Sequence, residues 1–244
     1  MNTFVIGDIH GAHKALMQCL KGSEFNYAED TLIVLGDVCD GWNEVPQCIE
    51  ELLKIKNLVY VWGNHDWWAN AWLKDGLEEI IWVTQGGQAT KNAYLSQPEY
   101  IVKHRHFFDV AKPYYLIHDN DSTKLFVHGG IPPSIIMKPI EKQDIQSLMW
   151  DRELLRQARL KHYRKPDFKW GGYDEIFIGH TATHGVKNDE PLKYCNVWCL
   201  DQGAGWDGKL TIMNVDTHKY WQSDNVLRLY PNVRGRADSL QYYY

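Results

Sequence analysis

The sequence predicts an α/β fold built on a mixed sheet, and three observations support this prediction. Short runs of β-branched and aliphatic residues alternate with segments whose apolar residues recur at helical spacing. The first three apolar runs each end in glycine followed by a polar residue, at Gly7, Gly36 and Gly63. Of the 244 residues, 44% are hydrophobic and 23% are charged, which is typical of one globular domain.

Three strands and two intervening helices are predicted in the first 66 residues. Strands are expected at 3–6, 31–35 and 58–62, and helices at 11–21 and 44–56. Strands joined by crossover helices run parallel, so their carboxyl ends meet at one edge of the sheet. Ligands of such sheets bind at that edge, and all three polar loops lie there.

The rest of the chain departs from this strand–helix rhythm. Residues 67–116 contain helical stretches around a Gly86-Gly87 interruption, and we expect them to form a helical cap inserted over the site. The domain prediction is therefore a single domain over 1–225, which includes this cap. The remaining residues, 226–244, are predicted to form a C-terminal tail that is loosely held from Asn232 to Tyr244.

Four further strands and one helix are expected after the cap. The strands are placed at 124–127, 175–178, 195–200 and 210–215, and the helix at 144–163. A glycine-rich turn joins the last two strands. We therefore expect them to form an antiparallel hairpin.

Charge and composition exclude several classes of protein. There are 26 Lys and Arg residues against 31 Asp and Glu residues, a formal net charge of −5, so dedicated nucleic-acid binding is not expected. Apolar runs such as Leu32 to Leu35 fall far short of the roughly 20 residues of a membrane helix. No secretory leader is visible, and the five cysteines form no C-x-x-C pair, so a cytoplasmic location without membrane association is expected.

Five predicted strand ends carry Asp, Asn or His side chains. They are Asp8 and His10 in GDIHG, Asp37 and Asp40 in GDVCD, Asn64, His65 and Asp66 in GNHD, His128 in VHGG, and His180 in IGHT. Each motif alone also fits an ordinary turn after a strand. Together they offer the nitrogen and oxygen ligands of divalent first-row metals. The set exceeds the needs of one ion, which favours two ions that share a carboxylate and clamp a phosphoryl group.

With these motifs in this order, the sequence resembles the calcineurin-like metallophosphoesterases, in particular the phosphoprotein phosphatase branch. The pattern of that family is GDxHG, GDxVDRG, GNHE or GNHD, then HGG, then GH, and the resemblance covers residues 3–215. It implies a β-sandwich flanked by helices, with a dinuclear metal centre at one edge.

The resemblance also implies six metal ligands: Asp8 and His10 for the first ion, Asp37 bridging both ions, and Asn64, His128 and His180 for the second. A hydroxide that bridges the metals would be the nucleophile. Manganese is the expected metal, with iron, zinc, cobalt or nickel as alternatives that the same ligands suit.

The catalytic side chains implied by the resemblance are His65, Asp40 and Arg152. His65 matches the general acid that protonates the leaving oxygen, and Asp40 matches the carboxylate that hydrogen-bonds His65 and raises its pKa. Arg152 lies in a Trp-Asp-Arg segment similar to one that supplies a phosphate-binding arginine. The alternative for Arg152 is an ordinary residue at the start of a surface helix.

One position departs from the family pattern. Gly41 and Trp42 follow Asp40 where the family has an arginine that grips the phosphate. Either Arg152 could compensate, or Trp42 could shape the pocket for a larger leaving group. The tryptophans that follow GNHD could stack a nucleobase, although core packing is the commoner role; they are Trp67, Trp68 and Trp72.

Three functions follow from this set of residues. The leading one is a metal-dependent phosphomonoesterase, of the Ser/Thr protein phosphatase type or of broad range. Its partner would be a phosphorylated substrate, either a phosphoprotein or a small phosphoester or nucleotide. The alternative is a dinucleoside polyphosphate hydrolase or phosphodiesterase with the same centre. A non-catalytic binding module is disfavoured because all six metal ligands and the His65–Asp40 pair are present.

Overall fold

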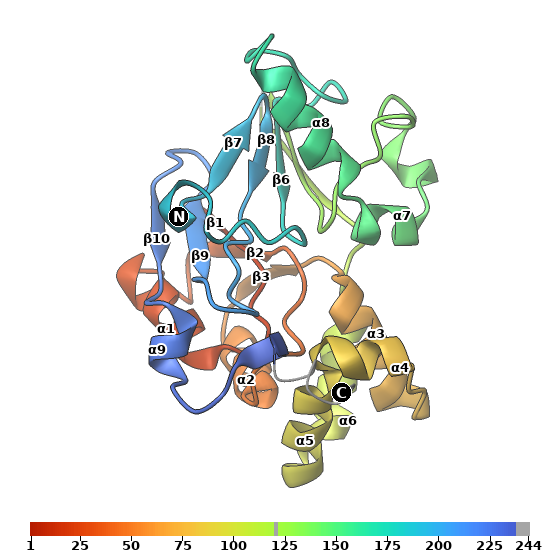
Figure 1. Ribbon diagram of the computed structural model, residues 1–244, viewed down its shortest axis with the longest axis vertical. Coiled ribbons are helices and arrows are strands. Elements are labelled where there is room, and N and C mark those ends of the chain that lie inside the picture. Colours follow the sequence, from red (N-terminus) through yellow and green to blue (C-terminus); the bar gives the residue numbers. More distant parts are fainter. Residues whose placement is uncertain (120–121, 238–244) are drawn as a thin grey trace.

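Two five-stranded sheets form the frame of the computed structural model, which describes residues 1–119 and 122–237 (Figure 1). The first sheet has the order β10-β9-β1-β2-β3, with β1 (Thr3–Ile6), β2 (Thr31–Val34), β3 (Asn57–Tyr60), β9 (Thr211–Asn214) and β10 (Tyr220–Gln222). The second has the order β4-β5-β6-β8-β7, with β4 (Tyr115–Asp119), β5 (Ser122–Phe126), β6 (Glu175–Ile178), β7 (Leu192–Tyr194) and β8 (Val197–Cys199). The predicted α/β class and sandwich are confirmed.

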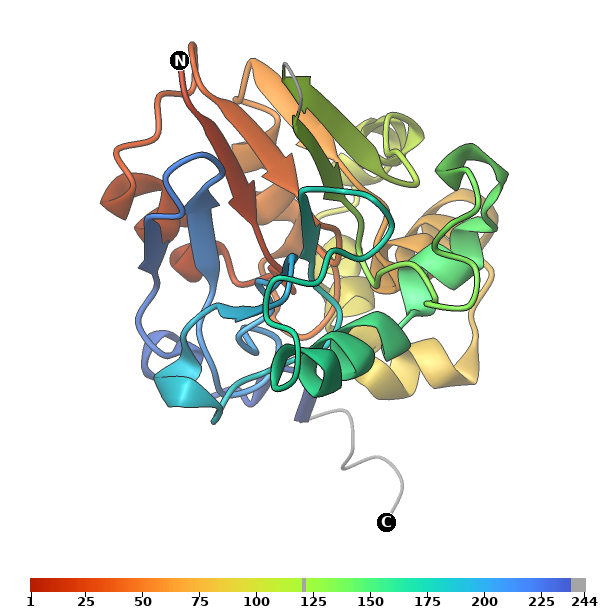
Figure 2. The ribbon, with the colours of Figure 1, turned by 90° about the horizontal axis from the view of Figure 1, so that it is seen from above.

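Parallel strands lie at the centre of both sheets. In the first, β1, β2 and β3 are parallel, with Thr3 opposite Thr31 and Thr31 opposite Asn57, while β9 runs antiparallel to β1. In the second, β5, β6 and β8 are parallel, and β4 and β7 are antiparallel to their neighbours. Figure 2 shows β1 and β2 (red to orange) beside β4 and β5 (olive).

Along the central strands, successive side chains point alternately into two separate hydrophobic cores. Val5 and Ile33 face the second sheet, where they meet Phe126 and Phe177, whose rings stack with centroids 4.9 Å apart. Phe4 points the opposite way, into the core that also contains residues of α1 (His13–Gly22) and α2 (Val45–Leu52). Because both faces of these strands are buried, residues 4–6 of β1 and 32–34 of β2 are all apolar, as is usual in parallel strands.

The helices fall into groups around the two sheets (Figure 1). One group comprises α3 (Asn64–Asp75), α4 (Ile80–Trp82), α5 (Gln88–Ser96) and α6 (Tyr100–Asp109), with the irregular turn η1 (Val83–Gly87) between α4 and α5. Residues of α7 (Ile145–Trp150) and α8 (Glu153–His162) share a core with the second sheet. The shorter elements are η2 (Ile140–Lys142), η3 (Lys187–Asp189) and α9 (Val226–Leu229). In the described part of the chain, no helix has both the length and the apolar character needed to cross a bilayer.

Two expected elements differ from the structure. The helix expected over 144–163 is split into α7 and α8, because Asp151 is extended and its side chain accepts a hydrogen bond from the backbone N–H of Leu154. The late hairpin is also wrong. β8 pairs with β6 and β7, while β9 pairs with β1 and β10, so the glycine-rich segment carries the chain from one sheet to the other.

The chain after residue 225 is also better anchored than expected. Val226 is fully buried, its backbone N–H bonds to the carbonyl of Gly208, and Tyr230 is 8% exposed. The backbone N–H of Arg236 bonds to the carbonyl of Gly205. The expectation of a loosely held tail is therefore wrong for residues 232–237, and its remainder, 238–244, lies outside the described residues. The domain boundary at 225 and the role of 67–116 as a cap stay predictions.

Candidate metal centre

The site is built on tight turns at the carboxyl ends of the strands. His10, Asp37 and His180 have positive φ values of 51°, 49° and 64°, a backbone region that few residues other than glycine adopt. A β-carbon on Gly36 would lie 2.5 Å from the backbone nitrogen of Gly63, so the turns after β2 and β3 pack backbone to backbone. Such strained turns aim side chains at a common point, and they are common at functional sites.

Asp37 lies at the centre of the cluster. Its Oδ1 accepts a hydrogen bond of 2.9 Å from the backbone N–H of His65. Its Oδ2 lies 3.3 Å from Nε2 of His128 and 3.8 Å from Nε2 of His10. One carboxylate therefore faces imidazoles that come from both sheets.

Two groups of three residues, each able to hold a metal ion, share this carboxylate: Asp8, His10 and Asp37 form one, and Asp37, His128 and His180 form the other. Within each group, the ligand atoms lie within 4.8 Å of one another, and all five residues are buried. Oδ1 of Asn64 lies 3.1 Å from Nε2 of His128, beside the second group. The structure thus brings together all six residues predicted as ligands.

The imidazole orientations fit cations. Nδ1 of His10 donates to the carbonyl of Cys39 at 2.9 Å, and Nδ1 of His128 donates to the carbonyl of Leu35 at 2.7 Å. A carbonyl can only accept, so Nε2 is the nitrogen of each ring that faces the cluster and binds a metal ion once it carries no proton. Nε2 of His180 is buried and has no hydrogen-bond partner among the residues that the structure describes. An acceptor nitrogen of this kind is satisfied when it binds a metal ion.

The charges of the cluster also favour bound cations. Burial raises the pKa of Asp8 well above its usual range, and the nearby carboxyl of Asp201 adds to the effect. Burial also acts on Asp37, but the imidazoles of His128 and His65 outweigh it and hold the pKa of Asp37 well below its usual range. Buried carboxylates of this density need compensating positive charge, which divalent cations would supply.

His65 and Asp40 form a buried pair beside the cluster. Nδ1 of His65 lies 2.7 Å from Oδ2 of Asp40. The hydroxyl of Thr90 donates to Oδ1 of Asp40 at 2.6 Å, and the indole N–H of Trp82 donates to Oδ2 at 2.8 Å. Both donors come from the helical segment of residues 80–96, so that segment fixes the carboxyl that orients His65.

The expected rise in the pKa of His65 is wrong for this structure. Burial, followed by the charge of Arg236, lowers the pKa of His65 to about 3, because an imidazolium loses its hydration there. Burial likewise raises the pKa of Asp40 to about 8, against the hydrogen bonds from Thr90 and Trp82. Burial therefore disfavours charge on both members of the pair.

Sequence patterns do not reveal the roles of three residues around this pair. Trp82 and Thr90 contact Asp40 from 42 and 50 residues away, so no local motif marks them. Asp66 belongs to the GNHD motif, but the motif alone does not indicate what it binds. Its Oδ1 accepts hydrogen bonds from the backbone N–H groups of Val38 and Cys39, and this shapes the loop that carries Asp37.

Arg152 and two tryptophans border the cluster. Nη1 of Arg152, which is exposed, donates to the carbonyl of His180 at 3.2 Å. The ring of Trp68 packs edge-on against His65 at 5.4 Å, and Trp150 packs against His180 at 5.7 Å. The two indoles contact each other at 5.1 Å, and Trp150 is 38% exposed. They form an aromatic edge along this side of the site.

The other tryptophans lie elsewhere. Trp42 is fully buried, donates from its indole N–H to the carbonyl of Ala204 at 2.7 Å, and stacks on Tyr230 at 4.6 Å. A role for Trp42 in shaping the substrate pocket is therefore wrong, because no part of it reaches the surface. Trp72 packs on Trp82 inside the helical segment.

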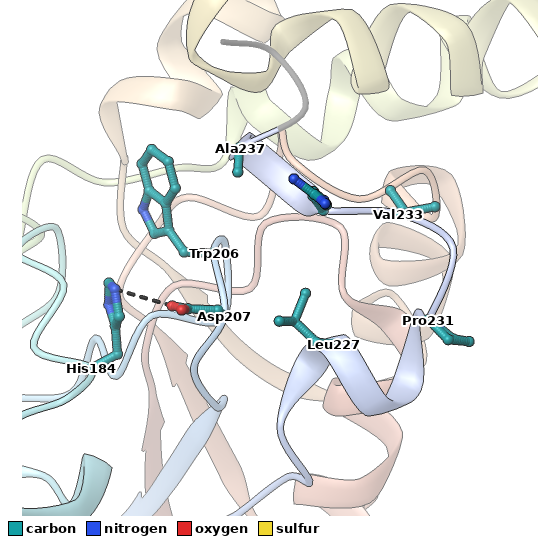
Figure 3. Close-up of a pocket in the computed structure, with 8 residues that line it drawn as sticks. His184, Trp206, Asp207, Leu227, Pro231, Val233 and Ala237 are labelled. Atoms are coloured by element: carbon teal, nitrogen blue, oxygen red, sulfur yellow. Dashed lines mark ion pairs between the residues drawn. The ribbon is translucent and has the colours of Figure 1, made fainter. Parts of the chain in front are cut away.

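A cavity of about 570 Å³ opens between the glycine-rich segment and the C-terminal residues (Figure 3). It is lined by His184, Trp206, Asp207, Leu227, Pro231, Val233, Arg234 and Ala237. Nε2 of His184 lies 3.2 Å from Oδ1 of Asp207, the ion pair drawn in the figure.

Comparison with known proteins identifies the family. The model of the calcineurin-like phosphoesterases matches residues 1–206 of this chain. The chain belongs to the calcineurin-like phosphoesterase family. As a member of this family it is a metal-dependent hydrolase of phosphoester bonds, which confirms the enzyme class expected from the sequence.

Among its relatives is serine/threonine-protein phosphatase 1 of Salmonella typhimurium, 26% identical over 220 residues, which cover 88% of this chain and 92% of that protein. A symmetrical bis(5'-nucleosyl)-tetraphosphatase of Pseudomonas fluorescens is also 26% identical, over 275 residues, with coverage of 89% and 92%. The crystal structure of a metallophosphoesterase from Sphaerobacter thermophilus superposes with a TM-score of 0.53 at 16% identity, covers 95% of each chain, and supports the fold alone.

Proposed function

We propose that this phosphoesterase hydrolyses phosphate monoesters, as a Ser/Thr-type protein phosphatase or a phosphatase of broad range. The observation that carries the proposal is the pair of three-residue groups that share Asp37, with the His65–Asp40 pair beside them. The similarity to the Salmonella protein phosphatase supports the substrate class.

The six residues around Asp37 would hold two divalent ions. Asp8 and His10 would bind the first, Asn64, His128 and His180 the second, and Asp37 both. When bound, the ions supply Lewis acidity toward the phosphoryl oxygens and lower the pKa of a water molecule between them. Manganese is the ion we favour, because oxygen and imidazole donors of this kind suit it, with iron, zinc, cobalt and nickel as the alternatives.

His65 would deliver the proton that the leaving oxygen needs. Its Nδ1 is held by Asp40, so the ring is fixed and Nε2 is directed away from that carboxyl. A proton on this ring would pass to a poor leaving group, which requires protonation as its bond to phosphorus breaks. The hydrogen bonds from Thr90 and Trp82 keep Asp40 in place during this transfer.

Arg152 would bind the phosphoryl group from the side of His180. One of its Nη atoms donates to the carbonyl of His180, which places the guanidinium next to the second metal group. A guanidinium at that place can donate two parallel hydrogen bonds to phosphoryl oxygens and balance their charge.

A second candidate is the hydrolysis of dinucleoside polyphosphates at the same centre. The similarity to the Pseudomonas tetraphosphatase supports it, and so does the aromatic edge of Trp68 and Trp150, on which a base could stack.

We also favour a cytoplasmic location, because all five cysteines are free buried thiols.

A substrate panel tests the proposal and separates the two candidates. Protein loaded with Mn²⁺ is assayed on para-nitrophenyl phosphate, its bis ester, a phosphoserine peptide and diadenosine tetraphosphate, beside protein stripped by chelation. The highest kcat/KM on the monoester and the peptide would support the proposal, and a clear preference for diadenosine tetraphosphate would favour the second candidate. Absence of metal-dependent turnover on all four substrates would contradict both.

A further inference from the structure

The side chain of Arg236 runs through a slot made by three glycines. A β-carbon on Gly41 would lie 3.2 Å from Cγ of Arg236, and one on Gly86 would lie 3.1 Å from the same atom. A β-carbon on Gly205 would lie 3.0 Å from Cδ. Gly41 and Gly86 have φ values of +100° and +115°, and the N–H of Gly41 bonds to the carbonyl of Gly86. Three distant segments thus leave the space that one arginine stem fills.

The head of Arg236 is fixed by neutral groups. Its Nε donates to the carbonyl of Gln85 at 3.0 Å, and its Nη2 donates to the side-chain oxygen of the same residue at 3.2 Å. Its Cζ lies 4.6 Å from the ring centre of Trp206, a cation–π contact. The backbone N–H of Arg236 bonds to Gly205. These contacts orient the guanidinium without neutralising its charge.

The slot leads to the metal cluster on the side of His10. The β-carbon position of Gly205 that meets Arg236 also lies 2.5 Å from Cδ2 of His10, and that of Gly41 lies 3.5 Å from Cβ of His10. Arg152 contacts His180 of the other three-residue group. The side chains of Arg236 and Arg152 therefore lie beside different halves of the candidate metal centre.

We infer that Arg236 binds the phosphoryl group of the substrate from the His10 side, while Arg152 binds it from the His180 side. An arginine has five N–H groups, and Gln85 takes up two of those of Arg236. The other three N–H groups of Arg236, two on Nη1 and one on Nη2, would donate hydrogen bonds to phosphoryl oxygens. The C-terminal segment would thus supply a cation at Gly41, a position with no side chain of its own. This inference rests on the proposed phosphatase function.

The test compares Arg236→Ala, Arg236→Lys and the wild type in the full-length protein loaded with Mn²⁺. Arg228→Ala is the matched control, because Arg228 is an exposed arginine of the same segment. Three quantities are measured: kcat/KM on para-nitrophenyl phosphate, the affinity for inorganic phosphate by isothermal titration calorimetry, and the metal content. Rescue of the alanine variant by guanidinium chloride, far below denaturing concentrations, is measured as well.

Arg236→Ala should lower kcat/KM by about 10- to 150-fold and weaken phosphate binding by a similar factor, which is the range of charge-assisted hydrogen bonds. The metal content should stay the same, guanidinium should restore part of the activity, and lysine should rescue only partly because it lacks the planar fork. Arg228→Ala should stay within about twofold of the wild type.

Two results would overturn the inference. One is an Arg236→Ala protein that matches the wild type within about twofold in both kcat/KM and phosphate affinity. The other is a loss of activity with unchanged phosphate affinity and no guanidinium rescue, which would make Arg236 a structural anchor of the C-terminal segment. If Arg236→Ala fails to fold, the Arg236→Lys variant is used in its place. Unchanged phosphate affinity and kcat/KM in that variant would contradict the inference. A wild type that binds phosphate but hydrolyses no ester would instead contradict the proposed function, and phosphate titration would still report on Arg236.

Discussion

The two sides of the candidate metal centre are assembled in different ways. On the His180 side, Arg152 directly follows Asp151 at the break between α7 and α8, so a short segment of sequence fixes its place. On the His10 side, Arg236 reaches the centre from the end of the described chain, through a slot that Gly41, Gly86 and Gly205 leave open. One side is thus encoded locally, and the other depends on packing between segments that are far apart in the sequence.

Under our inference, Arg236 compensates for the missing side chain at Gly41. Gly41 has no side chain to offer, yet the space above it is filled by the stem of another residue, and a side chain at position 41 would crowd that stem. A variant motif therefore needs to be judged together with the residues that pack against it.

The largest effect is expected where the two sides meet, at Asp37. Asp37→Ala removes the carboxylate shared by both three-residue groups, so both ions should bind poorly and kcat should fall by about 10⁴-fold or more. Elemental analysis and steady-state kinetics check this, with the exposed Asp75→Ala as control. Full retention of both ions in Asp37→Ala would show that the two sides share no ligand.

The next effect concerns the proton donor. His65→Ala should keep the metals and lose about 10²–10⁴ in kcat on alkyl phosphates, whose leaving oxygen needs protonation. The loss on para-nitrophenyl phosphate should be smaller, because para-nitrophenolate leaves without a proton. The control is His106→Ala, since the side chain of His106 is 79% exposed. Equal losses on both kinds of substrate would rule out a general acid.

A smaller effect is expected for Arg152. Arg152→Ala should lower kcat/KM on monoesters by at least about tenfold with the metals still bound, and Arg152→Lys should recover only part. The exposed Arg159→Ala is the control from the same helix. Combined with Arg236→Ala, the two losses should multiply if each side binds the phosphoryl group independently. Wild-type kinetics in Arg152→Ala would make Arg152 an ordinary surface residue.

The smallest effect is expected for the support of Asp40. Thr90→Val removes the hydroxyl that donates to Asp40 at nearly constant volume, so kcat on alkyl phosphates should fall about two- to tenfold. The hydrogen bond from Thr90 lowers the pKa of Asp40. Its loss should therefore raise that pKa and move the alkaline limb of the kcat profile to higher pH. A shift to lower pH would mean that the His65–Asp40 pair does not set this limb.

The sequence predicts well the metal-ligand residues on the turns after β1 and β2, and the reason is physical. Asp8 and His10 follow β1 within four residues, and Asp37 follows β2 within three, so strand patterns place each of these side chains at a known edge. Parallel pairing of β1 with β2 then fixes that edge for both turns.

The residues that surround these ligands could not be predicted in the same way. Trp82 and Thr90 reach Asp40 from a helical segment that has no strand register, and an ordinary core tryptophan would look the same in the sequence. The glycine-rich segment around Gly205 was interpreted as a hairpin turn, whereas it crosses between the sheets and passes close to His10. Such close approaches depend on tertiary packing, which sequence periodicity does not record.

The most direct test of a two-ion phosphoesterase centre is a metal titration of the wild-type protein. Chelator-stripped protein is titrated with Mn²⁺ while bound metal per chain and turnover of para-nitrophenyl phosphate are measured on the same samples. Because both three-residue groups include Asp37, we expect binding to saturate at two ions per chain and full turnover to appear only as the second ion binds. Full activity in the stripped protein, or full activity with a single bound ion, would contradict the two-ion centre.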